Sequence, residues 1–117
     1  MWLLQGDFMK KICFTVPVDH CEQVKAAMYQ AGAGRFEGYD LQCWQVLGQA
    51  EFRPLQGSNP TTGETGKLEK VAEYKVELFC KDEFLDASIA AMKAAHPYEG
   101  PQFEVYTIEN SLSIPRG

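Results

Sequence analysis

The 117-residue sequence lacks a long apolar run, a concentrated basic segment and a closely spaced pair of cysteines. Without about 20 consecutive apolar residues it offers no candidate membrane-spanning helix, so we expect no membrane association. Sixteen acidic residues against eleven basic ones give a net charge of −5, and the basic residues are scattered. A non-specific nucleic-acid binder needs a concentrated positive field, so we expect no nucleic-acid partner.

The cysteines are few and far apart: Cys13, Cys21, Cys43 and Cys80. They form no CxxC pair, which argues against a structural zinc site. The apolar start Met1–Leu4 gives way to polar residues too soon for an export signal. We therefore expect reduced thiols and a cytoplasmic location. Met9 is a second candidate start, in which case residues 1–8 are an N-terminal extension.

The sequence does contain enough apolar residues for one folded domain, with 45% hydrophobic and 12% aromatic residues. Alternating and β-branched residues predict four strands, at 9–18, 39–47, 72–80 and 103–108. Apolar residues at helical spacing predict two helices, at 19–31 and 82–96. The first helix is expected to begin with a capping box, in which Asp19 is the cap and Glu22 its partner.

The order β-α-β-β-α-β predicts a ferredoxin-like α+β sandwich, in which an antiparallel four-stranded sheet carries both helices on one face. The single domain is expected to span 9–108, with 109–117 as a C-terminal tail. A long loop rich in glycine and proline, 48–67, is expected between strands two and three, and such loops are usually functional or mobile.

The face of the sheet opposite the helices needs either a partner or contact with water. Glu73, Lys75 and Glu77 alternate outward on strand three, which predicts a partly solvated face. Trp44, Phe52 and Phe79 would add apolar area near it, which favours self-association.

Several short motifs occur in a fixed order: Gly32-Ala33-Gly34-Arg35, Cys43-Trp44, Phe52-Arg53-Pro54, Gly57-Ser58-Asn59-Pro60 and His96-Pro97-Tyr98-Glu99. Together they resemble the inserted domain of NIF-three-like proteins and the free-standing proteins made of that domain alone. The resemblance covers 9–108 and implies a fold similar to PII signalling and CutA-type proteins, which are usually trimeric. It also implies that the larger, hydrolase-like metal domain of the full-length relatives is absent, so their enzyme name is not expected to apply.

The His-Pro-Tyr-Glu segment is the strongest candidate site. His96 ends the second helix, where the negative end of the helix dipole favours an imidazolium. His96 and Glu99 could bind a divalent metal, the one cofactor considered, and Cys43 would join them only if the fold brings it near. The alternative is a structural joint, in which Pro97 ends the helix and Tyr98 packs.

The glycine-rich loop supplies a second group of candidates. Arg53 is a planar donor that could hold a carboxylate or phosphate, and we expect Arg53 or the Asn59-Pro60 turn to approach His96–Glu99. The ligand-binding residues predicted from the sequence are Arg53, Asn59, His96, Tyr98 and Glu99. Cys43 is interpreted as a small core residue and Cys21 as an incidental surface residue.

No nucleophile elbow or pair of catalytic carboxylates stands out, so no catalytic residue is assigned. The sequence thus favours a non-enzymatic cytoplasmic module that binds a small ligand or metal, regulates a process and self-associates. A trimer is expected by analogy, with a sheet-paired dimer as the alternative and a regulatory protein as a further partner. The rival hypothesis is a metal-dependent enzyme or metal-binding protein that uses His96–Glu99.

Overall fold

A computed structural model describes residues 9–109, which form four strands and two α-helices. In chain order the elements are β1 (Met9–Pro17), the 3-10 turn η1 (Val18–His20), α1 (Cys21–Gln30), β2 (Trp44–Phe52), β3 (Glu69–Lys81), the 3-10 turn η2 (Asp82–Phe84), α2 (Leu85–Ala95) and β4 (Phe103–Ile108). The expected N-terminal extension, and the expected tail beyond Glu109, lie outside the described residues. Within residues 9–109 no helix is both long and apolar enough to cross a membrane.

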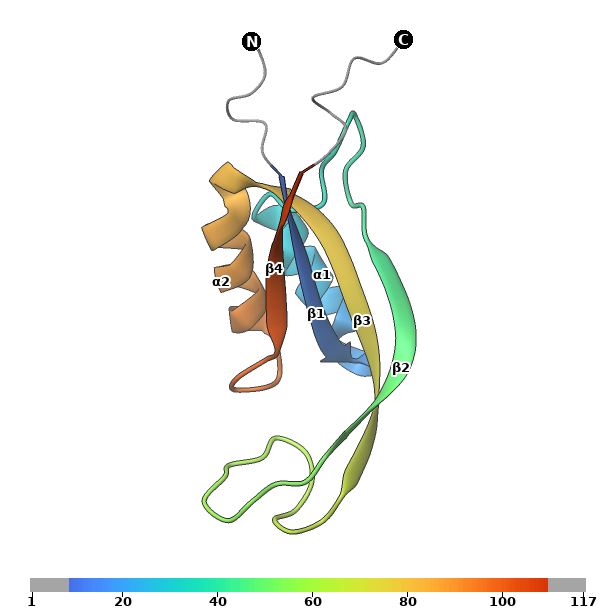
Figure 1. Ribbon diagram of the computed structural model, residues 1–117, viewed down its shortest axis with the longest axis vertical. Helices are drawn as coiled ribbons and strands as arrows, with labels where there is room; N and C mark the ends of the chain where they lie inside the picture. Colours follow the sequence, from blue (N-terminus) through green and yellow to red (C-terminus); the bar gives the residue numbers. More distant parts are fainter. Residues whose placement is uncertain (1–8, 110–117) are drawn as a thin grey trace.

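The four strands form one antiparallel sheet in the order β2-β3-β1-β4. In the middle of the sheet, Ile12 of β1 lies opposite Leu78 of β3 on one side and Val105 of β4 on the other. Both helices cover the same face of the sheet and pack against each other (Figure 1). The predicted ferredoxin-like α+β fold is therefore confirmed.

The hydrophobic core lies between the sheet and the two helices. Side chains alternate across a strand, and every second residue of β1 therefore faces the helices. Ile12, Phe14 and Val16 occupy these positions and are at most 2% exposed. The rest of the core comes from β3, the helices and the turn after α1: Cys21, Val24, Met28, Ala33, Val76, Leu78, Cys80 and Met92. Each of the larger apolar side chains among them contributes about 1.5–3 kcal/mol on burial, which fixes the frame that carries the site.

The opposite face of the sheet carries a small group of charges. Lys11 and Lys75 lie on either side of Glu77, with N–O distances of 2.8 and 3.7 Å. The hydrogen bond from Lys11 lowers the pKa of the Glu77 carboxyl. The prediction that this face is solvated is correct for Lys75, which is exposed, but wrong for Glu73, which is only 6% exposed.

β2 begins and ends later than predicted, at Trp44–Phe52 rather than 39–47. Its second half pairs with the first residues of β3, down to Phe52 opposite Glu69. This backbone ladder overrides the weak strand propensity of Gly48-Gln49-Ala50. The connecting loop is consequently 53–68, and the outer ends of β2 and β3 extend past the end of β1 as a two-stranded arm (Figure 1).

Both helices begin through a 3-10 turn rather than through a side-chain cap. The N-cap residue of α1 is His20, no side chain caps the helix, and Asp19 lies inside η1. The predicted capping box is therefore wrong. The backbone itself satisfies this end, because the Cys21 N–H donates to the carbonyl oxygen of Val18.

Candidate functional site

His96 follows directly after α2 and turns the chain back toward the sheet. Its backbone N–H donates to the Met92 carbonyl, and its own backbone is extended, because the following proline disfavours helical geometry. The imidazole is 7% exposed. Its Nε2–H donates to the carbonyl oxygen of Thr15 at 2.8 Å, and its Nδ1 accepts from the Tyr98 N–H at 3.1 Å.

These two hydrogen bonds assign the His96 tautomer and its charge. A ring nitrogen that accepts from a backbone N–H cannot carry a proton, so the imidazole is neutral with its proton on Nε2. Burial lowers the pKa of His96 from its ordinary value of 6.5. The predicted imidazolium at the helix end is thus wrong: desolvation outweighs the helix dipole. In this arrangement neither ring nitrogen is free to bind a metal.

Tyr98 connects the same segment to the sheet. Its hydroxyl donates to the Glu73 carboxylate at 2.7 Å and so explains how an acidic residue is buried there. Burial and the neighbouring Glu73 raise the pKa of Tyr98 well above its usual value. The Tyr98 ring also lies against the imidazole of His96, with ring centroids 5.2 Å apart. The segment is therefore anchored at both residues.

The 53–68 loop folds back toward this anchored segment. The Gly66 N–H donates to the Pro54 carbonyl at 2.7 Å, which closes the base of the loop over a buried Pro54. Further along, the Thr61 hydroxyl donates to the Pro97 carbonyl at 3.3 Å. The loop and the His96–Glu99 segment, which are far apart in sequence, therefore meet within one chain.

An open cavity of about 470 Å³ lies where these two segments meet. Its walls come from the turn after β1, the loop, the start of β3 and the segment after α2: Pro17, Val18, Asp19, His20, Thr61, Thr62, Lys70, Val71, Ala72, Pro97 and Tyr98. The polar groups among them are an ammonium, an imidazole, hydroxyls and one carboxylate. Such a mixture suits a small polar molecule.

The structure brings together only part of the site predicted from the sequence. Tyr98 lines the cavity, and the His96 ring packs against Tyr98 without lining the cavity itself. The exposed Arg53, Asn59 and Glu99 are not among the lining residues either. The ion pairs within residues 9–109 do not join Arg53 to Glu99. The loop does approach the segment as predicted, but through Thr61 rather than Arg53 or the Asn59-Pro60 turn.

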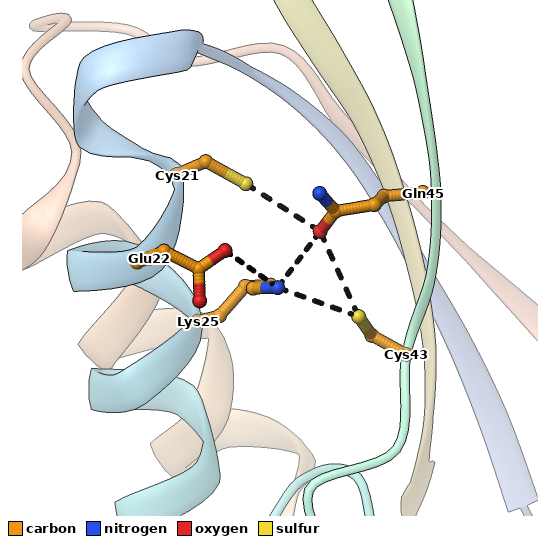
Figure 2. A network of polar contacts seen from close by, with 5 residues as sticks. All are labelled: Cys21, Glu22, Lys25, Cys43 and Gln45. Atoms are coloured by element: carbon orange, nitrogen blue, oxygen red, sulfur yellow. Dashed lines mark hydrogen bonds and ion pairs between the residues drawn. The ribbon is translucent and has the colours of Figure 1, made fainter.

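Cys43 lies in a different place, in a polar cluster between α1 and β2 (Figure 2). At its centre, Lys25 Nζ lies 2.9 Å from Glu22, 2.8 Å from the Gln45 amide oxygen and 3.7 Å from Cys43 Sγ. Cys43 therefore does not join His96 and Glu99. Among the described residues, no group of three His, Cys, Asp or Glu side chains is placed to hold a metal ion.

From the sequence, one member of this polar cluster, Cys21, was misplaced, and another, Lys25, was not singled out. Cys21, expected at the surface, is 1% exposed, and Lys25 is 8% exposed on the inner side of α1. Burial raises the pKa of the Cys21 thiol. Burial also acts to lower the pKa of Lys25, but the Glu22 carboxylate and the nearby thiols outweigh it and raise that pKa. The sequence did carry a signal for the burial of Lys25, because this residue lies next to Val24 and Met28 on the apolar stripe of the helix.

The fold is that of the CutA proteins. CutA from Archaeoglobus fulgidus is 18% identical with a TM-score of 0.63, and the match covers 89% of this chain and 87% of that one. CutA from Xylella fastidiosa is 19% identical with a TM-score of 0.65, covering 90% and 88%. At these identities the likeness concerns the fold alone.

Within that fold class, the chain is similar to one part of NIF3-related proteins. A Bacillus cereus protein related to NIF3 is 34% identical with a TM-score of 0.77, covering 92% of this chain and 27% of that one. A GTP cyclohydrolase 1 type 2 homolog of Mycobacterium leprae is 40% identical over 93 residues, 80% of this chain and 24% of that protein. The homolog of Bacillus subtilis is 37% identical over 105 residues, which cover 90% of this chain and 28% of that protein. No protein-family model matches the sequence.

This chain therefore resembles a CutA-like domain of NIF3-related proteins, as its motifs predicted. It spans about a quarter of the length of the curated relatives that it matches. The function of those longer proteins is not carried over by a match of this extent.

Proposed function

We propose that this chain is a non-enzymatic regulatory module that binds a small anionic molecule in the cavity between the 53–68 loop and the His96–Glu99 segment. The observation that carries the proposal is the hydrogen bond from Thr61 to the Pro97 carbonyl, which brings the loop to the cavity wall. Lys70 and the Thr62 hydroxyl supply donors at the cavity wall, whereas the Thr61 hydroxyl proton is used in the bond to the Pro97 carbonyl. Carboxylate and phosphate groups are the acceptors that such donors favour.

The metal hypothesis needs a free His96 ring nitrogen beside Glu99, with Cys43 as an optional third ligand, and the contacts of these residues oppose it. His96 uses both ring nitrogens within the protein, and Cys43 belongs to the cluster around Lys25. Metal analysis of protein purified without an affinity tag separates the hypotheses. Stoichiometric zinc, copper or iron that is lost in His96→Ala would reverse our preference.

Ligand binding is tested by titrating isotope-labelled protein with inorganic phosphate and following the amide signals by NMR, against sodium chloride at equal ionic strength. We expect saturable shifts confined to 17–20, 61–62, 70–72 and 97–98. Lys70→Met should remove them by deleting a cavity-wall cation, whereas Lys67→Met should keep them, because Lys67 pairs with Glu64 outside the cavity. Shifts that are absent, or that survive Lys70→Met, would contradict the proposal.

Self-association is the second part of the proposed function, and the free edge of β2 supports it. β2 is an outer strand of the sheet, so its outward backbone groups have no strand partner among residues 9–109. Trp44, Val46 and Leu47 on this strand are 59%, 45% and 59% exposed. A long apolar edge of this kind is a template for pairing with a second copy, as a trimer by analogy with CutA-type proteins or as a sheet-paired dimer.

Light scattering at tens of micromolar tests this proposal. We expect an assembly for the unmodified chain and a monomer for Val46→Lys, because a lysine in the middle of an edge strand opposes pairing. Val105→Lys, on the opposite edge strand β4, is the matched control and should leave the assembly intact. A monomeric unmodified chain, or disruption by Val105→Lys alone, would contradict it.

We propose a cytoplasmic location as well. Cys13, Cys21, Cys43 and Cys80 are all unpaired, which is the state that a reducing compartment maintains. Cell fractionation with an antibody to the chain would test this, and recovery in an exported fraction would overturn it.

A further inference from the structure

Two thiols in the polar cluster between α1 and β2 share one acceptor. Cys21 Sγ lies 3.7 Å from the Gln45 amide oxygen, and Cys43 Sγ lies 3.8 Å from the same atom. Figure 2 shows both thiols directed at that oxygen from opposite elements. The two sulfur atoms are therefore separated by no more than the sum of these two distances. To bond, the two sulfur atoms would have to approach each other by rotation of both side chains, with Gln45 moving aside.

The two thiols differ in their surroundings. Cys43 is half-buried and lines an open cavity of about 270 Å³, whose other walls include Gln42, Trp44 and Phe79. Cys43 as a residue is therefore partly open to solvent. Cys21 is 1% exposed.

Lys25 places a positive charge beside the accessible thiol. Its Nζ is 3.7 Å from Cys43 Sγ, and its raised pKa keeps it an ammonium at neutral pH. A cation next to a sulfur stabilises the thiolate, which is the form that reacts with electrophiles and oxidants. The cluster therefore combines an accessible thiol, a neighbouring cation and a second thiol within reach.

We propose that Cys43 and Cys21 form a peroxide-responsive thiol pair that closes to an intramolecular disulfide. In the first step Cys43 sulfur attacks hydrogen peroxide: an S–O bond forms, the O–O bond breaks, and the departing hydroxide leaves as water with the thiol proton. In the second step Cys21 sulfur attacks the resulting sulfenic acid: the S–S bond forms and the S–O bond breaks. The hydroxide that leaves takes the Cys21 proton as a second water, so two thiols and one peroxide give one disulfide and two waters.

The disulfide would tie the first residue of α1 to the residue that precedes β2. It would expel the Gln45 amide from between the two sulfurs and remove the Cys43 contact of Lys25. Cys13 and Cys80 are the internal controls, because they are also buried but lie outside this cluster, with Cys80 donating to Ser88.

The test treats the folded, reduced chain with hydrogen peroxide, alkylates the remaining thiols and measures intact mass and peptides. We expect the loss of two hydrogen atoms, a Cys21–Cys43 cross-linked peptide, and fully alkylated Cys13 and Cys80. In Cys21→Ser, dimedone should trap a sulfenic acid at Cys43, whereas Cys43→Ser should leave Cys21 unreacted. Lys25→Met should slow Cys43 oxidation on the order of tenfold, and Lys25→Arg should restore most of the rate.

Two results would overturn the proposal without relying on any variant. One is an unreacted Cys43 in the unmodified chain under conditions that oxidise glutathione. The other is oxidation of Cys13 or Cys80 at the same rate as Cys43, which would show that the cluster confers no reactivity.

Discussion

His96 makes the free energy of unfolding depend on pH in a predictable direction. The unfolded chain binds a proton at this residue near pH 6.5, but burial lowers the pKa in the folded chain. The unfolded state therefore binds more protons in the interval between the two pKa values. We expect the free energy of unfolding to decrease as the pH falls from 7.5 to 5.5, by up to about 1.4 kcal/mol per unit from this group.

Urea unfolding at several pH values measures this dependence. His96→Gln should flatten the profile over that interval, whereas His20→Gln, at the other histidine, should keep it. A profile that stays unchanged in His96→Gln would mean that the imidazole is not buried in its neutral form.

Tyr98 stabilises the fold through the buried Glu73. In Tyr98→Phe the carboxylate loses the donor that lies 2.7 Å away, so we expect a loss of about 1.5–3 kcal/mol in the free energy of unfolding. Tyr106→Phe is the matched control, because its hydroxyl donates to an exposed Glu104, and its effect should stay within about 0.5 kcal/mol. Equal effects of the two changes in thermal or urea unfolding would contradict the assigned role of Tyr98.

At the residue scale the sequence singled out the His96–Glu99 segment but not the contacts that each of its residues makes. His96 was selected because helix ends favour cations, yet its burial and the Tyr98 N–H bonded to Nδ1 keep it neutral, and only the folded chain supplies both. Cys21 and Lys25 were missed for a related reason. Their burial depends on where Gln45 of β2 lies across from α1, and helical periodicity within α1 does not reveal that.

Among the elements, the end of α1 depends on a glycine that no other residue can replace without cost. Gly32 has a φ of +116°, and a Cβ there would lie 2.6 Å from the Phe84 ring at the start of α2. Gly32→Ala should therefore lower the free energy of unfolding by about 1–3 kcal/mol from overpacking, in addition to backbone strain.

The matched control is Gly38→Ala, which has a φ of +87° but open space where the Cβ would be. It carries the backbone strain without the clash, so the difference between the two variants in urea unfolding isolates the contact with Phe84. Two equal losses would show that Gly32 matters only for its backbone conformation.

The elements themselves were predictable where each one carries its own pattern. β1 and β4 have alternating, β-branched segments, and their bounds agree closely with the prediction. β2 does not, because Gly48 to Ala50 becomes a strand only by pairing with β3. Likewise Asp19 has the residue type of a cap, but η1 satisfies the backbone in its place. Long-range pairing and local backbone hydrogen bonds decide these cases.

On the scale of the whole molecule, the parts of the cavity proposed to bind a ligand lie at one end of the sheet. The chain leaves β1 at Pro17, enters β3 near Lys70 and returns from α2 at Pro97, and all three positions line the cavity. The ferredoxin-like order predicts this gathering, since each connection must leave at an end of the sheet. The inward fold of the 53–68 loop was predicted as an approach to His96–Glu99, but the contact residue depends on loop geometry that composition does not encode.

The contact between the 53–68 loop and the Pro97 turn is the feature on which the proposed cavity depends. Nuclear Overhauser contacts between the Thr61 methyl group and the ring protons of Pro97 or Tyr98, in isotope-labelled protein without added ligand, measure it directly. We predict that these contacts are observed and that Thr61→Val weakens them, because valine keeps the shape but loses the hydroxyl bonded to the Pro97 carbonyl. Their absence from the unmodified chain, with the loop signals averaged to those of a mobile segment, would contradict the cavity that this contact forms.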